Sequence, residues 1–351
     1  MPTLWTEDER LLLAGTSLES ALRAKLLALR TEFDLVQDKS SNIPCWNSVL
    51  WETGSIRFRD WILLDAWYRS RCLELPTSGE GMVPCLDMVN HSSSPTAYYE
   101  EDSKGGVALL LRPGISVPKG DEITISYGEN KPAAEMLFSY GFVDVTSAKE
   151  SLTLPLEPFP DDPLSKAKLV AFGDQPKVHV AHGDDDGIKW QSPFAYLMCV
   201  NEEDGVEFRV LQDTEGNRQL RVFWMDEDVT EKANDFETLT RAHELWALFK
   251  LRVVTTVQDC LYTHLQRMQS PMALDTISDS EASNVRRECM EAATSLRGIE
   301  SRLLERAVEH LENEVRNLAP ETREAGTGEG RSLLMHKHPS NIITTCWGSG
   351  H

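Results

Sequence analysis

Three short stretches carry most of the information in this sequence. The first is Pro84-Cys85-Leu86-Asp87-Met88-Val89-Asn90-His91-Ser92, an apolar string that ends abruptly in polar residues. The second is Lys119-Gly120-Asp121-Glu122-Ile123-Thr124-Ile125-Ser126-Tyr127-Gly128, and the third is Phe138-Ser139-Tyr140-Gly141-Phe142. The first stretch predicts a buried strand with a polar end, and the strict alternation over residues 123–127 predicts a half-buried strand.

The surrounding residues predict helices before these stretches and a β-rich unit around them. Thr6-Glu7-Asp8-Glu9 and Thr16-Ser17-Leu18-Glu19 both fit the capping box that starts a helix. A second helical run carries apolar residues from Trp61 to Cys72. Short apolar strings then alternate with turn residues from Gly79 to Asp144, and Pro132–Tyr140 predicts a short helix that ends at Gly141.

A second unit is predicted after a Pro- and Asp-rich linker over residues 155–163. It contains a hairpin over residues 206–211 and 219–224. Two long helices follow, over residues 236–268 and 282–318, and a Gly-rich tail over residues 319–351 ends the chain. The apolar stripes of the two helices indicate packing faces rather than ligand sites.

The composition limits the partners of the chain. Its 351 residues include 35 Lys and Arg against 56 Asp and Glu, which gives a net charge of −21. Such acidity disfavours nucleic acid and suits either a basic protein partner or simply solubility. No apolar run reaches the roughly 20 residues of a membrane span. The acidic start is unlike a secretory signal, and the seven cysteines form no C-x-x-C pair. We therefore expect an intracellular protein, in the cytoplasm or the nucleus or both.

Two further patterns predict no ligand site. Gly326-Thr327-Gly328-Glu329-Gly330 lacks the preceding strand and following helix of a phosphate loop, so we interpret it as linker. His179 and His182 precede Asp184-Asp185-Asp186 and could ligate a metal, but a polar hairpin tip is the more common meaning of such a pattern. We predict no metal site.

Together, the three opening stretches resemble the SET-domain methyltransferases, in particular the class of the Rubisco large-subunit lysine methyltransferase, which includes fungal ribosomal-protein methylases. Arg69-Ser70-Arg71 and Leu13-Ala14-Gly15-Thr16 also look like landmarks of that class. The resemblance implies an α+β fold with four parts. These are a helical insertion (residues 1–78), the C-terminal half of the SET domain with its pseudoknot (79–145), a helical substrate-binding domain (146–318) and a disordered tail (319–351).

The resemblance also implies a function, namely methylation of a protein lysine with S-adenosylmethionine as the cofactor. The substrate would be a Lys-bearing protein, possibly ribosomal or histone-like. Methyl transfer to an amine is an in-line displacement, which requires that both reactants be positioned and that the amine arrive neutral. By resemblance Tyr127 would be the catalytic tyrosine.

The resemblance assigns the other site residues by position. Arg71, Asn90 and His91 would bind the cofactor. Tyr140, together with either Tyr98 or Tyr99, would line the lysine channel; of these two we select Tyr98. Asp87 also matches a substrate-site position.

One segment of the family pattern has no counterpart before Trp5. Members of the class open with a G-x-G-bearing strand pair and the first SET strands, and we expect this chain to lack them. The chain is then an incomplete form of an active enzyme, a degenerate member that binds a basic protein without methylating it, or a member with unrecognised replacement strands. A histidine acceptor, used by one branch of the family, also stays open.

Overall fold

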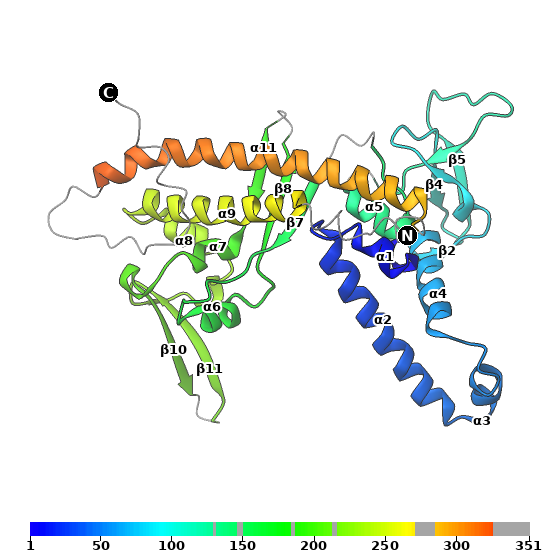
Figure 1. Cartoon of the computed structure of the whole chain (residues 1–351), viewed down its shortest axis with the longest axis horizontal. Helices are drawn as coiled ribbons and strands as arrows, with labels where there is room; N and C mark the ends of the chain where they lie inside the picture. Colours follow the sequence, from blue (N-terminus) through cyan, green and yellow to red (C-terminus); the bar gives the residue numbers. More distant parts are fainter. Residues whose placement is uncertain (129–130, 146–149, 184–186, 213–215, 271–284, 326–351) are drawn as a thin grey trace.

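The structure is a computed structural model that describes residues 1–128, 131–145, 150–183, 187–212, 216–270 and 285–325, with side chains up to residue 319. Two long helices, α9 (Trp246–Gln269) and α11 (Arg287–Ala325), run side by side along the long axis of the molecule (Figure 1). A helical arm at the N-terminal end and a β-hairpin at the other end both project from this pair (Figure 1).

The chain begins with a short 3-10 helix η1 (Pro2–Leu4) and helix α1 (Glu7–Leu11). The predicted capping box at Thr6 is confirmed, since Glu9 N donates to Thr6 Oγ1 at 3.2 Å and Thr6 N donates to Glu9 Oε2 at 2.9 Å. The box predicted at Thr16 is wrong. Helix α2 (Leu18–Ser41) does follow it, but the Thr16 hydroxyl donates to Leu13 O, and Ser17 N donates to Glu300 of α11 at 3.0 Å.

The helical arm consists of α2, α3 (Pro44–Trp46), the π-helical turn η2 (Asn47–Trp51) and α4 (Phe58–Arg71). Its tip is held by aromatic contacts around Phe33, whose ring centroid lies 5.7 Å from that of Trp51 and 5.8 Å from that of Phe58. At its base, Arg69 donates to Phe138 O at 2.6 Å and to Thr3 Oγ1 at 3.0 Å. This arginine therefore joins α4 to two other elements.

The predicted β-rich unit is confirmed, although its strands are shorter than expected. Three separate pairs form: β1 (Cys72–Leu75) with β2 (Gly79–Met82), β4 (Ala97–Glu101) with β5 (Val107–Leu111), and β3 (Asn90–His91) with β6 (Thr124–Ile125). The first two pairs are antiparallel and the third is parallel. Helix α5 (Ala133–Tyr140) ends at Gly141 with φ +89°, as the C′ glycine predicted.

Two strand predictions in this unit are wrong. Residues 86–88 form a 3-10 helix, η3 (Leu86–Met88), rather than a strand. Of the alternating segment 123–127, the strand comprises only Thr124–Ile125. Alternation describes which side chains can be buried, whereas a strand also needs a backbone partner, and β3 offers only Asn90 and His91 for pairing.

The described part of the second unit contains two three-stranded sheets. The first comprises β7 (Ser151–Pro155), β8 (Lys177–His182) and β9 (Ile188–Gln191), and the second comprises β10 (Val206–Gln212), β11 (Arg218–Trp224) and β12 (Glu227–Asp228). The predicted hairpin is confirmed, with Val206 opposite Trp224. The shorter helical elements are α6 (Ser165–Phe172), α7 (Pro193–Met198), η4 (Glu202–Asp204), η5 (Thr230–Lys232) and α8 (Phe236–Arg241).

The two predicted long helices differ from the observed helices at their ends. The first is broken, because α8 ends at Arg241 and α9 begins at Trp246. The second, α11, continues to Ala325 instead of ending at residue 318. Residues 326–351, which include the Gly-rich pattern 326–330, lie outside the described part of the chain. The four domain boundaries remain predictions.

The described residues form two hydrophobic cores, and α11 takes part in both. The larger core holds α7, α9 and the strands of the second unit together with Leu303, Leu304, Ala307 and Leu311 of α11. The smaller core holds Trp5, Leu12 and Leu13, which flank α1, and residues of α2 and α5. It also holds Cys289, Ala293, Leu296 and Ile299 from the beginning of α11. The helix predicted to belong to the second unit therefore also completes the core of the first.

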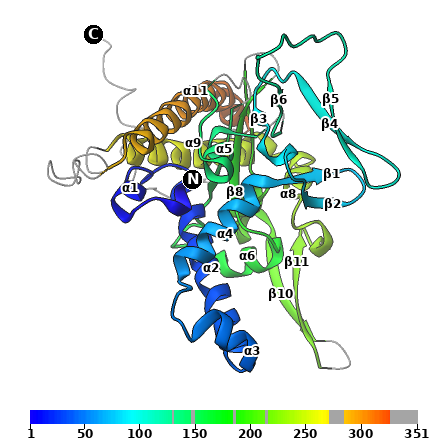
Figure 2. The same cartoon turned by 90° about the vertical axis from the view of Figure 1, so that its right-hand side faces the viewer.

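The β4–β5 hairpin is an exception to this burial. It projects from the body of the molecule (Figure 2). In β5 the side chains of Leu109, Leu110 and Leu111 are 38%, 37% and 44% exposed, and within the described residues the outer edge of this strand pairs with no other strand. An apolar edge strand of this kind favours association with another strand.

Candidate active site

The parallel pair β3–β6 brings together residues from the first two stretches quoted above. Asn90 lies opposite Thr124 and His91 lies opposite Ile125. Ile125 is 1% exposed, so this short pair is anchored in the protein interior. The chain beyond β6 then places Tyr127 directly beside His91, with their ring centroids 5.3 Å apart.

Tyr127 is held at three points. Its hydroxyl donates to Val89 O at 2.8 Å, and its backbone N–H donates to His91 Nδ1 at 3.1 Å. The Tyr140 hydroxyl donates to the carbonyl oxygen of Tyr127 at 3.4 Å. Because the side chain and both main-chain polar groups have partners, the orientation of the phenol ring is fixed by the fold.

His91 has a defined role for each ring nitrogen. A backbone N–H can only donate, so Nδ1 must carry the lone pair that accepts from Tyr127. Nε2 then carries the proton and faces Asp144 Oδ2 at 3.2 Å. The His91 side chain is 8% exposed and that of Asp144 is 12% exposed, so this arrangement is largely shielded from water.

Aromatic rings surround Tyr127 and His91. The Tyr127 and Tyr140 ring centroids are 4.5 Å apart, and Phe142 lies 6.4 Å from each of them. Burial raises the pKa of the Tyr127 hydroxyl; Arg71 opposes this shift, and the neighbouring Tyr140 and Glu122 add to it. Burial also raises the pKa of Tyr140. Both phenols are therefore protonated at neutral pH and act as hydrogen-bond donors rather than as bases.

Three further predicted residues lie next to this aromatic group. Arg71 Nη1 donates to Asp87 O at 2.8 Å and lies 2.9 Å from Met88 Sδ. Asp87 thus takes part through its main-chain carbonyl. Asn90 Nδ2 donates to Glu122 Oε1 at 2.6 Å, which ties β3 to the segment that leads into β6.

The choice of Tyr98 is not supported by the geometry. Successive strand residues point to opposite faces, so Tyr98 and Tyr99 of β4 cannot both face the site. The hydroxyl that donates to Glu74 O at 3.1 Å is that of Tyr99. Burial, Glu74 and Tyr140 all raise the pKa of Tyr99, so it is Tyr99 that lies near Tyr140.

The structure therefore brings together Arg71, Asp87, Asn90, His91, Tyr127 and Tyr140, and leaves out Tyr98. Sequence reasoning missed the roles of Glu122 and Asp144. Glu122 lies within the second stretch, whereas Asp144 follows the third stretch and no sequence pattern marks it as a site residue. Its partner His91 is far away in sequence, so their contact depends on the fold.

The histidines considered for a metal have other partners. His179 Nδ1 lies 3.0 Å from Thr153 Oγ1, and His182 Nε2 lies 3.3 Å from Glu150 Oε2. Asp184, Asp185 and Asp186 lie outside the described residues. Among the described residues, no group of three His, Cys, Asp or Glu side chains is arranged to hold a metal ion. In the same part of the chain, no helix is both long and apolar enough to cross a membrane.

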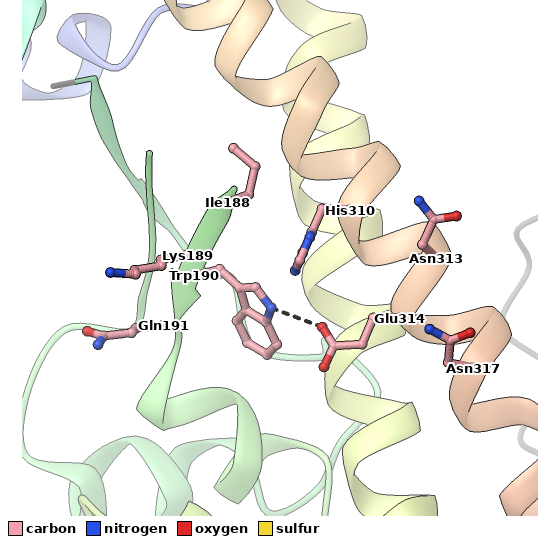
Figure 3. A pocket seen from close by; sticks show the side chains of 8 residues that line it. All are labelled: Ile188, Lys189, Trp190, Gln191, His310, Asn313, Glu314 and Asn317. Carbon is pink, nitrogen blue, oxygen red and sulfur yellow. Dashed lines mark hydrogen bonds between the residues drawn. The ribbon is translucent and has the colours of Figure 1, made fainter. Parts of the chain in front are cut away.

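A groove of 530 Å³ lies elsewhere, between β9 and α11. Trp190 points from β9 toward α11, where its Nε1 donates to Glu314 Oε2 at 3.2 Å (Figure 3). Lys250 pairs with the other oxygen of the same carboxylate at 2.7 Å. The central carboxylate of this groove is thus already neutralised, and the groove lies apart from the Tyr127 site.

Comparison with known proteins identifies relatives of this chain. No family model matches it. It is 28% identical over 281 residues to "SET domain-containing protein 8" of Schizosaccharomyces pombe, a match that covers 77% of this chain and 62% of that protein. It is also 28% identical over 189 residues to the chloroplastic Rubisco large-subunit N-methyltransferase of Pisum sativum, covering 48% of this chain and 36% of the pea protein. The chain thus spans less than two thirds of the length of these relatives.

Solved structures agree with the sequence comparison. The SET domain of the Rubisco methyltransferase bound to lysine and AdoHcy superposes with a TM-score of 0.61 and 15% identity, covering 94% of this chain and 73% of that one. The Rubisco methyltransferase bound to AdoMet gives a TM-score of 0.61 at 17% identity, covering 97% of this chain and 73% of that one. The predicted α+β SET fold is confirmed. The chain thus has the SET fold and is similar in sequence to the Rubisco large-subunit methyltransferase.

Proposed function

We propose that this chain is a protein-lysine N-methyltransferase that uses S-adenosylmethionine. The observation that carries the proposal is the three-point restraint of Tyr127 inside a group of aromatic rings. The names of the relatives agree with it, since the pea protein is a Rubisco N-methyltransferase and an Arabidopsis thaliana relative is an aldolase-lysine N-methyltransferase.

The residues at the site fit the proposed cofactor. When bound, S-adenosylmethionine would supply a methyl group on a sulfonium cation. Aromatic ring faces and carbonyl oxygens are favourable neighbours for a cation, and Tyr127, Tyr140 and Phe142 provide the rings. The guanidinium of Arg71 is suited to the carboxylate of the cofactor. Asn90 and His91 would bind it from β3, His91 through its main chain because both of its ring nitrogens have protein partners.

The chain's own residues would prepare the acceptor amine. The rings of Tyr127 and Tyr140 displace water, and desolvation lowers the pKa of a lysine, so the neutral amine is favoured. The Tyr127 hydroxyl, which is fixed by Val89 O, stays protonated and orients the reactants by hydrogen bonding. Tyr99 and Tyr140 would line the path of the lysine side chain.

The net charge of −21 supports a basic, lysine-rich protein substrate, such as a ribosomal or histone-like protein. The free thiols among the described cysteines support action inside the cell, in the cytoplasm or the nucleus.

The test begins with calorimetric titration of S-adenosylmethionine into the purified chain, followed by transfer of labelled methyl groups to peptide arrays with Lys or His acceptors. We expect saturable binding and labelling of Lys peptides. The variant Tyr127→Phe should abolish labelling, whereas Tyr262→Phe, which changes a 38% exposed tyrosine on α9, should leave it unchanged. Undiminished labelling by Tyr127→Phe contradicts the assignment.

A binding function without catalysis is the second candidate, and the strong acidity of the chain favours it. In that case a Lys-rich protein is captured equally well with and without the cofactor, and no labelling occurs with either acceptor.

A further inference from the structure

The Tyr127 restraint depends on a residue outside the three sequence stretches. His91 Nδ1 can accept from Tyr127 N–H only while it is unprotonated. A free neutral imidazole exchanges its proton between its two nitrogens, so something must keep the proton on Nε2. The group that faces Nε2 is the carboxylate of Asp144, at 3.2 Å.

We propose that Asp144 is a positioning residue for Tyr127 and acts through His91. A carboxylate only accepts hydrogen bonds, so it stabilises the Nε2–H tautomer and leaves the Nδ1 lone pair directed at Tyr127 N–H. This fixes the backbone at Tyr127 and hence the direction of its hydroxyl. The catalytic consequence rests on the function proposed above.

The packing around His91 leaves its Nε2 atom facing Asp144 Oδ2. The ring centroids of Phe142 and Tyr127 lie 5.8 Å and 5.3 Å from that of His91, so aromatic rings form the apolar surroundings of the imidazole. The carboxylate of Asp144 faces the imidazole of His91, while Arg71 and Glu122 act on the phenol of Tyr127. With both partners largely shielded from water, solvent cannot easily replace the carboxylate at Nε2.

The variant Asp144→Asn tests the proposal because it keeps the shape of the side chain but removes the preference for one tautomer. An amide presents both an acceptor oxygen and a donor nitrogen, so it can pair with either form of Nε2. Asp161→Asn is the matched control, since Asp161 is an exposed residue in the loop between β7 and α6.

The first readout is the tautomer of His91, measured by two-bond ¹H–¹⁵N correlation spectra of the full chain and assigned with a His91→Gln sample. We expect the Nε2–H form in the natural sequence and in Asp161→Asn, and a mixture or the Nδ1–H form in Asp144→Asn. A dominant Nδ1–H form in the natural sequence, or an unchanged tautomer in Asp144→Asn, overturns the proposal. This readout requires no turnover, so it is independent of the proposed function.

The second readout is steady-state methyl transfer. Partners that orient a metal-bound histidine typically contribute about 10- to 100-fold to affinity or activity, and we expect an effect of similar size for the partner of His91. We expect Asp144→Asn to lower kcat by about this factor with little change in KM for the cofactor. A loss confined to KM contradicts positioning of Tyr127. If the natural chain labels no acceptor, the proposed function fails, while the tautomer measurement still decides whether Asp144 positions His91.

Discussion

The contact between Glu9 and Arg286 gives the most quantitative prediction about stability. Glu9 has a carboxylate that is 1% exposed, and it accepts from Arg286 Nε at 2.7 Å and from Arg286 Nη2 at 2.8 Å. Its further donors are the backbone N–H groups of Thr6 and Arg286. The arginine precedes α11, so this contact joins the beginning of that helix to α1.

Replacing Arg286 with alanine leaves the buried carboxylate without its cation. Losing one partner of a fully buried ion pair costs about 3–5 kcal/mol. Since the Arg286 side chain is 50% exposed, water compensates in part, and we expect a loss of about 2–3 kcal/mol. The control is Arg287→Ala: its pair with Glu291 is 89% and 61% exposed, so its removal should cost about 0.3–0.5 kcal/mol.

The assay is denaturant unfolding of both variants at several pH values, with stability taken from the midpoint and the slope. The Arg286 hydrogen bonds lower the pKa of Glu9 far below its ordinary value of 4.5. A lowered carboxyl pKa contributes stability that is complete above the unfolded pKa and is lost as pH falls through the folded pKa. The difference between Arg286→Ala and the natural chain should therefore be largest near neutral pH and shrink below about pH 4.5. Equal effects of the two arginine variants would refute this reasoning.

Three other outcomes follow from the structure. Lys168 is 1% exposed and donates to Asp162 and to two carbonyl oxygens. The variant Lys168→Met should therefore lower the free energy of unfolding by about 3–5 kcal/mol in denaturant unfolding. Its control is Lys166→Met at an exposed position, which should cost less than about 0.5 kcal/mol. Leu110→Lys places a charge on the open edge of β5 and should reduce light scattering at high concentration without shifting the unfolding midpoint; unchanged scattering would show that this edge does not drive association. The raised pKa of Tyr127 means that its absorbance change should occur above pH 10, so Tyr127→Phe should remove a late component of the spectrophotometric titration and not an early one.

The sequence by itself was sufficient for the fold class, and most of the site residues that it predicted lie together around Tyr127 in the structure. The order of the Asn90-His91 stretch, the Tyr127 stretch and the Tyr140 stretch identified the SET class, because each stretch combines an unusual local pattern with a fixed position in the series. Local chemistry also predicted the helix start at Thr6 and the helix end at Gly141. Helix capping and left-handed glycines depend on residues that are close in the sequence, so the sequence alone is enough to predict these helix ends.

Tertiary structure decided what depends on a distant partner. Thr16 and Glu19 have the pattern of a capping box, yet Glu300 takes the backbone N–H of Ser17, because α11 brings a buried carboxylate to that helix end. The segment 123–127 alternates like a strand but pairs over two residues, since β3 is no longer than that.

The site shows the same division. Sequence could place tyrosines at 98 and 99 but not rank them, because the face of a strand that meets the site depends on packing against Glu74 and Tyr140. Asp144 could not be found from the sequence, because its contact with His91 forms only in the folded chain. Patterns along a chain determine which residue types are available, whereas hydrogen bonds between distant segments form only where the folded backbone brings their atoms within about 3 Å.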